Sequence, residues 1–255
     1  MKQILITPAA GKRLIAKAIA AHNTVLNASK SGTLVIIAGT TNGYVVEEIF
    51  KTLGILNDFS RKLFFRGIIV PYGKNVTSEG RLSDESNFPG DVIITKGKWQ
   101  KGKTLSNVVD DLKKGDVVLK GANAVDLHRK QAAILIGHPK AGTIAVALQA
   151  IMGRRVQLIL PVGLEKRVCS DLHAMATKVN MPNAEGYRLF PVPGQVFTEI
   201  EAVSLLTGAN AELVAAGGFN GAEGSCLLAI SGTKEQEQAT EKLADSIAAE
   251  PAFVL

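Results

Sequence analysis

The stretch from Thr33 to Glu48 constrains the fold most, because an apolar run, a short polar segment and a helical pattern follow one another directly. Residues 34–38 form an unbroken apolar run, which is typical of a strand covered on both faces in a parallel sheet. Residues 44–53 predict a helix, and Gly54 is placed to end it. We therefore predict an α/β fold: a parallel sheet with helices on both faces.

The polar segment between this strand and helix consists of Gly39, Thr40, Thr41, Asn42 and Gly43. It lies at the carboxyl end of a strand, where the next helix points its free N–H groups outward. Open α/β sheets bind phosphates and other anions at such positions. The alternative is an ordinary strand–helix turn in which Thr or Asn caps the helix.

Composition agrees with a globular protein that needs no metal or disulfide to fold. The chain has 255 residues, of which 46% are hydrophobic and 20% charged, enough for one large α/β domain or for one with a smaller companion. No secretion signal or membrane-length apolar run is present, which predicts a cytoplasmic protein without a membrane partner. A homo-oligomer is also possible.

Cysteine and histidine usage does not predict a metal site. Cys169 and Cys226 stand far apart without a C-x-x-C spacing, so we expect buried, reduced thiols. The four histidines are scattered and form no zinc motif. We expect no cofactor.

Positive charge is concentrated in one region. The net charge is +6, and residues 51–103 hold ten Lys or Arg against five Asp or Glu. Such a surface can face nucleic acid, a membrane or a small anion. Lys96, Lys98, Trp99, Lys101 and Lys103 have the composition of a stacking surface for single-stranded nucleic acid. A solvated loop explains the same pattern, and no recognisable nucleic-acid module surrounds it, so this is our least favoured hypothesis.

The same region lacks regular periodicity from about residue 55 to residue 103. Short strands are expected at residues 67–70 and 91–95, with long loops around them. Loops of this length are uncommon unless they cover a site, so we predict an insertion over the ligand pocket.

Outside the insertion, the order of the expected elements divides the chain in two. Residues 1–185 are predicted to form the α/β phosphate-binding domain, with a first helix from Thr7 to about Lys30 and, after residues 163–167, a later helix that runs to about Asn180. Residues 186–255 are predicted to form a small α+β C-terminal layer. Its helices are opened by the capping boxes Thr198-x-x-Glu201 and Thr233-x-x-Gln236, its strands lie at 212–216 and 225–231, and residues 188–192 are a candidate for one more strand.

Two more strands are predicted to end in polar loops that carry glycine. The loop after the strand that begins near Asp116 contains Lys120, Gly121 and Asn123, and the loop after residues 132–136 contains His138 and Lys140. In a parallel sheet these loops and Gly39–Gly43 would meet at one edge and could surround an anion.

Each candidate in these two loops also has a structural explanation. Lys120 could neutralise a phosphate or act as an amine of lowered pKa, or it could be a solvated lysine. Asn123 could bind a sugar hydroxyl or hold a left-handed turn. His138 and Lys140 could face the ligand, or belong to an ordinary loop before a helix.

Taken together, these loops resemble the superfamily of ribose-5-phosphate isomerase, glucosamine-6-phosphate deaminase, sugar-metabolism repressors and CoA transferases, over about residues 7–170. The sequence Ala38-Gly-Thr-Thr41 resembles the phosphate loop of these proteins. Residues 118–126 resemble their apolar strand followed by Asp-Gly-Ala-Asp-Glu-Val-Asp. Residues 160–166 are similar to the strand that ends in Asp-x-x-Lys, which carries Lys166 into the candidate site.

The departures from the family pattern concern the chemistry. The isomerase carboxylates are replaced by Lys120, Asn123 and Ala124, and the Asp of Asp-x-x-Lys by Gly163. Proton transfer between sugar carbons needs a base of suitable pKa, which these residues do not readily provide. The resemblance thus implies that the ligand is a phosphorylated sugar or a related small anionic metabolite. It also implies an isomerase-like or transferase-like enzyme that lacks the usual isomerase carboxylates. The alternative is a non-catalytic sensor or scaffold.

Overall fold

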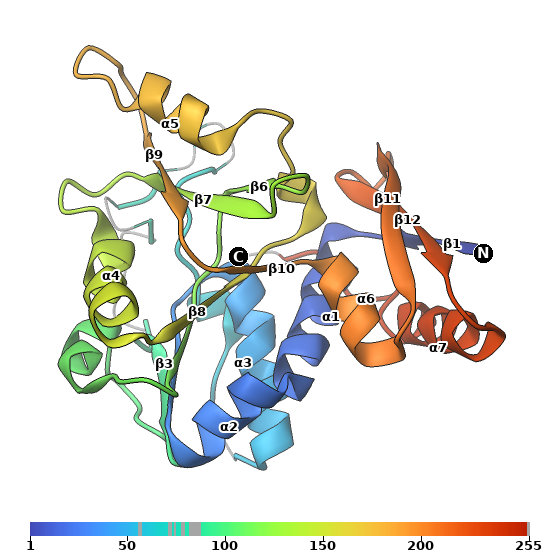
Figure 1. Ribbon diagram of the computed structural model, residues 1–255, viewed down its shortest axis with the longest axis horizontal. Coiled ribbons are helices and arrows are strands. Elements are labelled where there is room, and N and C mark those ends of the chain that lie inside the picture. Colours follow the sequence, from blue (N-terminus) through green and yellow to red (C-terminus); the bar gives the residue numbers. More distant parts are fainter. Residues whose placement is uncertain (56–57, 71–72, 74, 78–79, 82–87, 254–255) are drawn as a thin grey trace.

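The computed structural model describes residues 1–55, 58–70, 73, 75–77, 80–81 and 88–253. Its centre is a six-stranded sheet (Figure 1). In spatial order the strands are β10 (Gln195–Phe197), β8 (Gln157–Pro161), β5 (Val117–Leu119), β2 (Thr33–Ile36), β3 (Val92–Thr95) and β4 (Lys98–Trp99).

The predicted α/β class is confirmed, but the central sheet is mixed, not wholly parallel. Strands β10, β8, β5 and β2 run parallel to one another, whereas β3 is antiparallel to β2 and β4 is antiparallel to β3. The difference arises inside the expected insertion, where β3 and β4 form a hairpin around Lys96 and Gly97, both with positive φ. Such backbone is typical of tight hairpin turns.

Both faces of the central sheet are covered. In β2 and the residue after it, Leu34 and Ile36 pack on one face, while Val35 and Ile37 pack on the other. The first face carries α1 (Pro8–Ala21), α2 (Asn23–Ser31) and α3 (Thr40–Leu53), and the second carries α4 (Gly142–Arg154). Burial of each such aliphatic side chain is worth about 1.5–3 kcal/mol, so the sheet is the main source of stability.

A second, antiparallel sheet lies on the α4 side. It consists of β6 (Ala124–Asp126), β7 (Gln131–Ile136) and β9 (Arg188–Val192), and α5 (Leu172–Val179) packs against it. The expectation that residues 132–136 join the parallel sheet is therefore wrong. Only residues 127–130 connect β6 to β7, and a connection this short makes a hairpin rather than a parallel crossover.

Two helix predictions also need correction. The first helix does not reach Lys30 unbroken: His22 is extended (φ −71°, ψ 121°) and packs its ring against Phe197. Helix α3 begins at Thr40, not near Tyr44. The helix expected to end near Asn180 is confirmed as α5, which follows a 3-10 turn at Leu164–Lys166 and a segment bonded to β6 through Val168 N–H and Val125 O. No strand forms at residues 67–70.

The C-terminal part forms a third sheet with two helices (Figure 1). Its strands are β1 (Lys2–Ile6), β12 (Ser225–Ser231) and β11 (Asn210–Gly217), and its helices are α6 (Glu199–Thr207) and α7 (Lys234–Asp245). Both predicted capping boxes are present at the starts of α6 and α7. Strand β1 was not predicted, and residues 188–192 form β9 in the second sheet, not a strand of this layer.

The C-terminal layer shares its core with the α/β body. Leu228 and Ile230 of β12 belong to the same buried cluster as Leu14 of α1 and Leu34 of β2. The proposed division at residue 185 stays a prediction. Cys226 is buried in this cluster as expected, whereas Cys169 is exposed, so the expectation of a second buried thiol is wrong.

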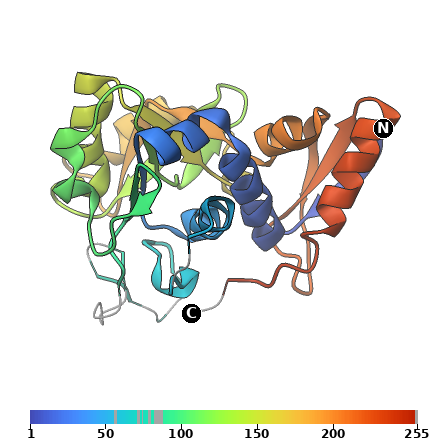
Figure 2. The same cartoon turned by 90° about the horizontal axis from the view of Figure 1, so that it is seen from below.

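After α7 the chain returns beneath the body toward α3 (Figure 2). Arg13 of α1 bonds to Glu47 and Glu48 of α3 and to Glu250 of this segment. Arg61 bonds to Glu47 and Glu250 as well. Several charges held in one network stabilise a structure more than an isolated surface pair does.

A buried carboxyl group lies where the layer meets the body. Glu199, at the start of α6, is 3% exposed and accepts a bond from Leu164 N at 2.9 Å. Burial raises the pKa of Glu199 to about 8; the nearby Glu165 charge adds to this, while the bond from Leu164 N and the charge of Lys12 oppose it. Glu199 is therefore largely protonated in the folded protein at neutral pH.

We expect Glu199→Gln to reduce the loss of stability on raising the pH. Because the folded-state pKa lies above the ordinary value of 4.5, the folded protein holds an extra proton, and the free energy of unfolding falls between about pH 4.5 and 8. The variant has no such proton to lose, so its advantage over the parent should grow by up to about 5 kcal/mol across this range. Urea unfolding at several pH values measures it.

Glu212→Gln on the exposed side of β11 is the matched control. It should leave the pH profile of stability unchanged. A constant difference between Glu199→Gln and the parent at every pH would show that Glu199 is ionised throughout.

Candidate functional site

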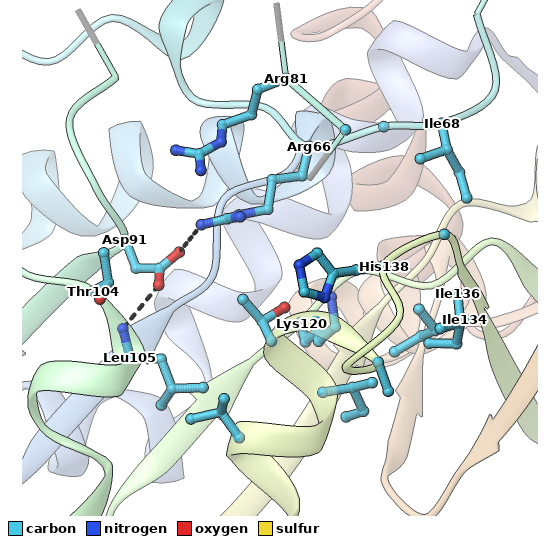
Figure 3. Close-up of a pocket in the computed structure, with 18 of the residues that line it drawn as sticks. Arg66, Ile68, Arg81, Asp91, Thr104, Leu105, Lys120, Ile134, Ile136 and His138 are labelled. Carbon is cyan, nitrogen blue, oxygen red and sulfur yellow. Dashed lines mark hydrogen bonds and ion pairs between the residues drawn. The ribbon is translucent and has the colours of Figure 1, made fainter. Parts of the chain in front are cut away.

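A cavity of about 600 Å³ opens at the edge of the sheet where β2 and β5 end. Its wall combines parts of the insertion, the end of β5, strand β7 and the start of α4 (Figure 3). The charged or ionisable residues that line it are Arg66, Arg81, Asp91, Lys120, His138 and Lys140. Cationic groups thus outnumber the single carboxylate among the described lining residues.

Lys120 follows β5 directly, and its backbone N–H bonds to Ile159 O of β8 at 3.1 Å, which fixes it at the sheet edge. Its side chain is partly exposed to the cavity, and no hydrogen bond joins its Nζ to another described residue. Burial lowers the pKa of Lys120 to about 8; the Arg66 charge lowers it further, and Asp91 opposes the shift. Near neutral pH, Lys120 is therefore mostly protonated, with an appreciable neutral fraction.

Asp91, the residue before β3, is fully buried and already has partners. Oδ1 accepts a bond from Ala38 N at 3.1 Å, and Oδ2 accepts one from Leu105 N at 2.9 Å. Arg66 lies 3.8 Å from Oδ1, and Figure 3 shows it reaching toward this carboxylate. Asp91 thus joins two backbone segments of the cavity wall. As a single carboxylate among several cationic side chains, it neutralises only part of the positive charge there.

Phe88 supports two of the cavity arginines. The guanidinium carbon of Arg66 lies 5.2 Å from the centre of the Phe88 ring, and that of Arg81 lies 4.3 Å from it. Cations stack favourably on aromatic faces, which orients both side chains. These arginines come from the insertion, so the segment predicted to cover a pocket does line this cavity.

His138 lies on the loop between β7 and α4. Its Nδ1 accepts a hydrogen bond from Lys140 N at 3.1 Å, so in the neutral ring the proton is on Nε2. The same loop leads into α4, whose first residues also line the cavity and whose N-terminus has no side-chain cap. Free N–H groups and the positive end of the helix dipole therefore lie at the cavity wall.

Four of the sequence-predicted residues meet at this cavity: Lys120, Asn123, His138 and Lys140. Asn123 has a structural role as well, since its Oδ1 accepts a bond from Leu135 N at 3.0 Å and links the end of β5 to β7. Gly121 lies on the same connection but is not among the lining residues.

The predicted phosphate loop has a different structure. Gly39 is the N-cap of α3, and Thr40 to Gly43 form its first turn, with Gly43 N bonded to Gly39 O at 2.8 Å. None of these five residues lines the cavity. Thr41 and Asn42 are buried, and Nδ2 of Asn42 donates to Ile37 O at 2.7 Å and to Leu119 O at 3.1 Å. Asn42 thus fastens α3 to the ends of β2 and β5.

Lys166 also lies outside the cavity lining. Its Nζ donates to Ala122 O at 3.1 Å, and burial lowers its pKa. At Gly163, a Cβ would overlap an oxygen of the Glu165 side chain, so a larger residue there requires that side chain to move.

Sequence reasoning missed Arg66, Arg81, Asp91 and Phe88 because all four lie in the segment without periodicity. The only available signal was the surplus of positive charge at residues 51–103. Trp99, in contrast, is partly buried and packs against Phe50, with ring centres 5.0 Å apart. Its ring is therefore already engaged within the protein.

We expect Asn42→Ala to destabilise the protein by about 1–3 kcal/mol, because Ile37 O loses the bond from Asn42 and Leu119 O keeps only the bond from Ile37 N. Thr40 lies in the same first turn of α3 and is partly exposed. Thr40→Ala should therefore change stability by less than about 0.5 kcal/mol. Urea unfolding of both variants measures the difference. An Asn42→Ala protein as stable as the parent would mean that these bonds contribute nothing.

Comparison of the chain with protein-family models, curated proteins and solved structures gave no match. Within the described ranges, no cluster of three or more His, Cys, Asp or Glu side chains is arranged to hold a metal ion. No helix formed by those residues has the length and apolar character needed to cross a membrane. The geometry of the cavity is therefore the basis for any functional conclusion.

Proposed function

We propose that this protein binds a phosphorylated sugar or a related small anionic metabolite in the cavity between β5, β7 and α4. The observation that carries the proposal is the composition of the cavity wall. Lys120, Lys140, Arg66 and Arg81 line it, and the only described carboxylate there, Asp91, is bonded to backbone N–H groups. Nζ of Lys120 has no hydrogen-bond partner among the described residues, so an anion bound in the cavity would supply one.

The size and lining of the cavity support a small metabolite. A volume of about 600 Å³ is within the usual range for pockets that hold small molecules. Thr104, Ser106, Asn123 and Thr143 add polar groups to the lining. Ile134, Ile136 and Ile144 provide an apolar side. Polar groups of this kind suit the hydroxyls of a sugar, while the cations and the start of α4 suit its phosphate.

Two other hypotheses remain open but have less support. A non-catalytic sensor or scaffold would use the same cavity, and screening for turnover of every stabilising ligand would distinguish it from an enzyme. Nucleic-acid binding through residues 51–103 is not favoured, because Trp99 packs on Phe50 and Lys101 pairs with Asp58. It would show as an affinity for oligonucleotides that falls steeply with salt.

We expect Lys120→Met to weaken sulfate and phosphate binding by about 10–100-fold, because a charge-assisted hydrogen bond is worth about 1.5–3 kcal/mol. Isothermal titration of the parent and the variant measures the affinity. Direct binding is preferable to a melting temperature here, because removing a desolvated charge can itself stabilise the fold.

Lys178→Met, on the exposed side of α5 and outside the cavity, is the matched control and should bind both anions like the parent. The proposal would be abandoned if neither anion bound the parent. It would equally be abandoned if Lys120→Met and Lys178→Met bound them alike.

Sulfate affinity should fall as the pH rises through about 8. Sulfate keeps its charge over this range, whereas Lys120, whose pKa is lowered to about 8, loses its positive charge. The other charged or titratable groups at this wall are Arg66, Arg81, Asp91, His138 and Lys140. Lys120→Arg stays protonated, so its affinity should be nearly constant between pH 7 and 9. A parent profile as flat as that of Lys120→Arg would contradict the assignment.

A further inference from the structure

The environment of Lys120 differs from that of an ordinary phosphate-binding lysine. Its Nζ has no hydrogen-bond partner among the described residues, and the nearby charged groups are Arg66, which repels the ammonium form, and the already bonded Asp91. Isoleucines 134, 136 and 144 form the apolar side of the same cavity. These surroundings favour the neutral amine, which is a nucleophile.

Lys166 provides a comparison within the same chain. It too is a desolvated lysine, but its Nζ donates to Ala122 O at 3.1 Å and it does not line the cavity. Burial alone therefore does not distinguish Lys120. What distinguishes Lys120 is the combination of a desolvated amine, an adjacent cavity large enough for a metabolite, and cationic groups that would hold an anionic ligand beside it.

We propose that Lys120 forms an imine with the carbonyl carbon of a small phosphorylated aldehyde or ketone bound in this cavity. The inference rests on the proposed function and specifies its substrate class. Lys140 and the N-terminus of α4, which line the same cavity, would hold the phosphate, so that Nζ of Lys120 meets the carbonyl group. His138, whose Nδ1 accepts a bond from Lys140 N, presents an Nε2–H that can polarise the carbonyl oxygen.

The chemistry of this step balances without a further reagent. The lone pair of neutral Nζ attacks the carbonyl carbon, and the C=O π pair moves to the oxygen. Both Nζ hydrogens then leave with that oxygen as one molecule of water, and a C=N bond remains. Protonation of the imine nitrogen by solvent restores a positive charge at this position, so the cavity keeps its electrostatic character. The cation withdraws electrons from the neighbouring carbon atoms.

Reductive trapping tests this inference. The protein is incubated at pH 7.5 with dihydroxyacetone phosphate or glycolaldehyde phosphate and sodium cyanoborohydride, digested, and examined by mass spectrometry. A lysine of pKa near 8 is neutral far more often at this pH than one near 10.5, so the Lys120 peptide should be modified at least about tenfold more than the Lys178 peptide. Inorganic phosphate should suppress the reaction by competition.

Two controls make the result specific. Lys120→Arg cannot form the imine under these conditions, so labelling at position 120 should be lost, while Lys178 should be labelled to the same small extent as in the parent. Dihydroxyacetone, which lacks the phosphate, should label Lys120 much less than its phosphate ester does.

Failure of the inference and failure of the proposed function give different results. If titration shows that both sugar phosphates bind the parent but Lys120 is labelled no more than Lys178, the imine is excluded and the binding site stands. If neither sugar phosphate nor inorganic phosphate binds, the anion site itself is wrong. Equal labelling of Lys120 and Lys166 would also overturn the inference, because it would show that desolvation alone, without the cavity, explains the reactivity.

Discussion

Burial of the central sheet on both faces is the constraint on which the rest of the structure depends. The last residues of β2 and β5, Ile36 and Leu119, are fully buried, so their backbone groups need partners within the protein. Asp116 accepts bonds from Thr33 N and Lys113 N where these strands begin. Asn42 and Asp91 bond to backbone groups where they end. Three short polar side chains thus fix α3, β3 and the insertion to the sheet.

The same constraint accounts for the character of the cavity. Asp91 and Asn42 use their polar atoms on the backbone, whereas Lys120, at the same edge, has no such partner among the described residues. The low-dielectric surroundings that strengthen the structural bonds also make an unpaired cation costly. Lys120 is therefore one position at this edge where polar interactions within the described structure remain incomplete, and an anionic ligand in the cavity would complete them.

The sequence was most informative where local signals decide the structure. Periodicity located β2, β5 and β8, and the capping boxes at Thr198 and Thr233 correctly marked the starts of α6 and α7. The sequence-based prediction failed where contacts between distant residues matter. An example is His22, which interrupts the expected first helix and packs against Phe197. For the site, Lys120, Asn123, His138 and Lys140 were found from their places after apolar strands. Arg66 and Arg81 could not be found, because only the folded insertion brings them to the cavity. The superfamily resemblance stays a prediction.

The pairing of β1 with β12 has a consequence for how the chain is made. Residues 2–6 leave the ribosome long before the strand they pair with, residues 225–231. Until those residues are made, β1 lacks this partner strand, and its backbone donors and acceptors are open to other chains. Contacts so distant in sequence form slowly. The third sheet is therefore completed only after the residues that form the central sheet have been made.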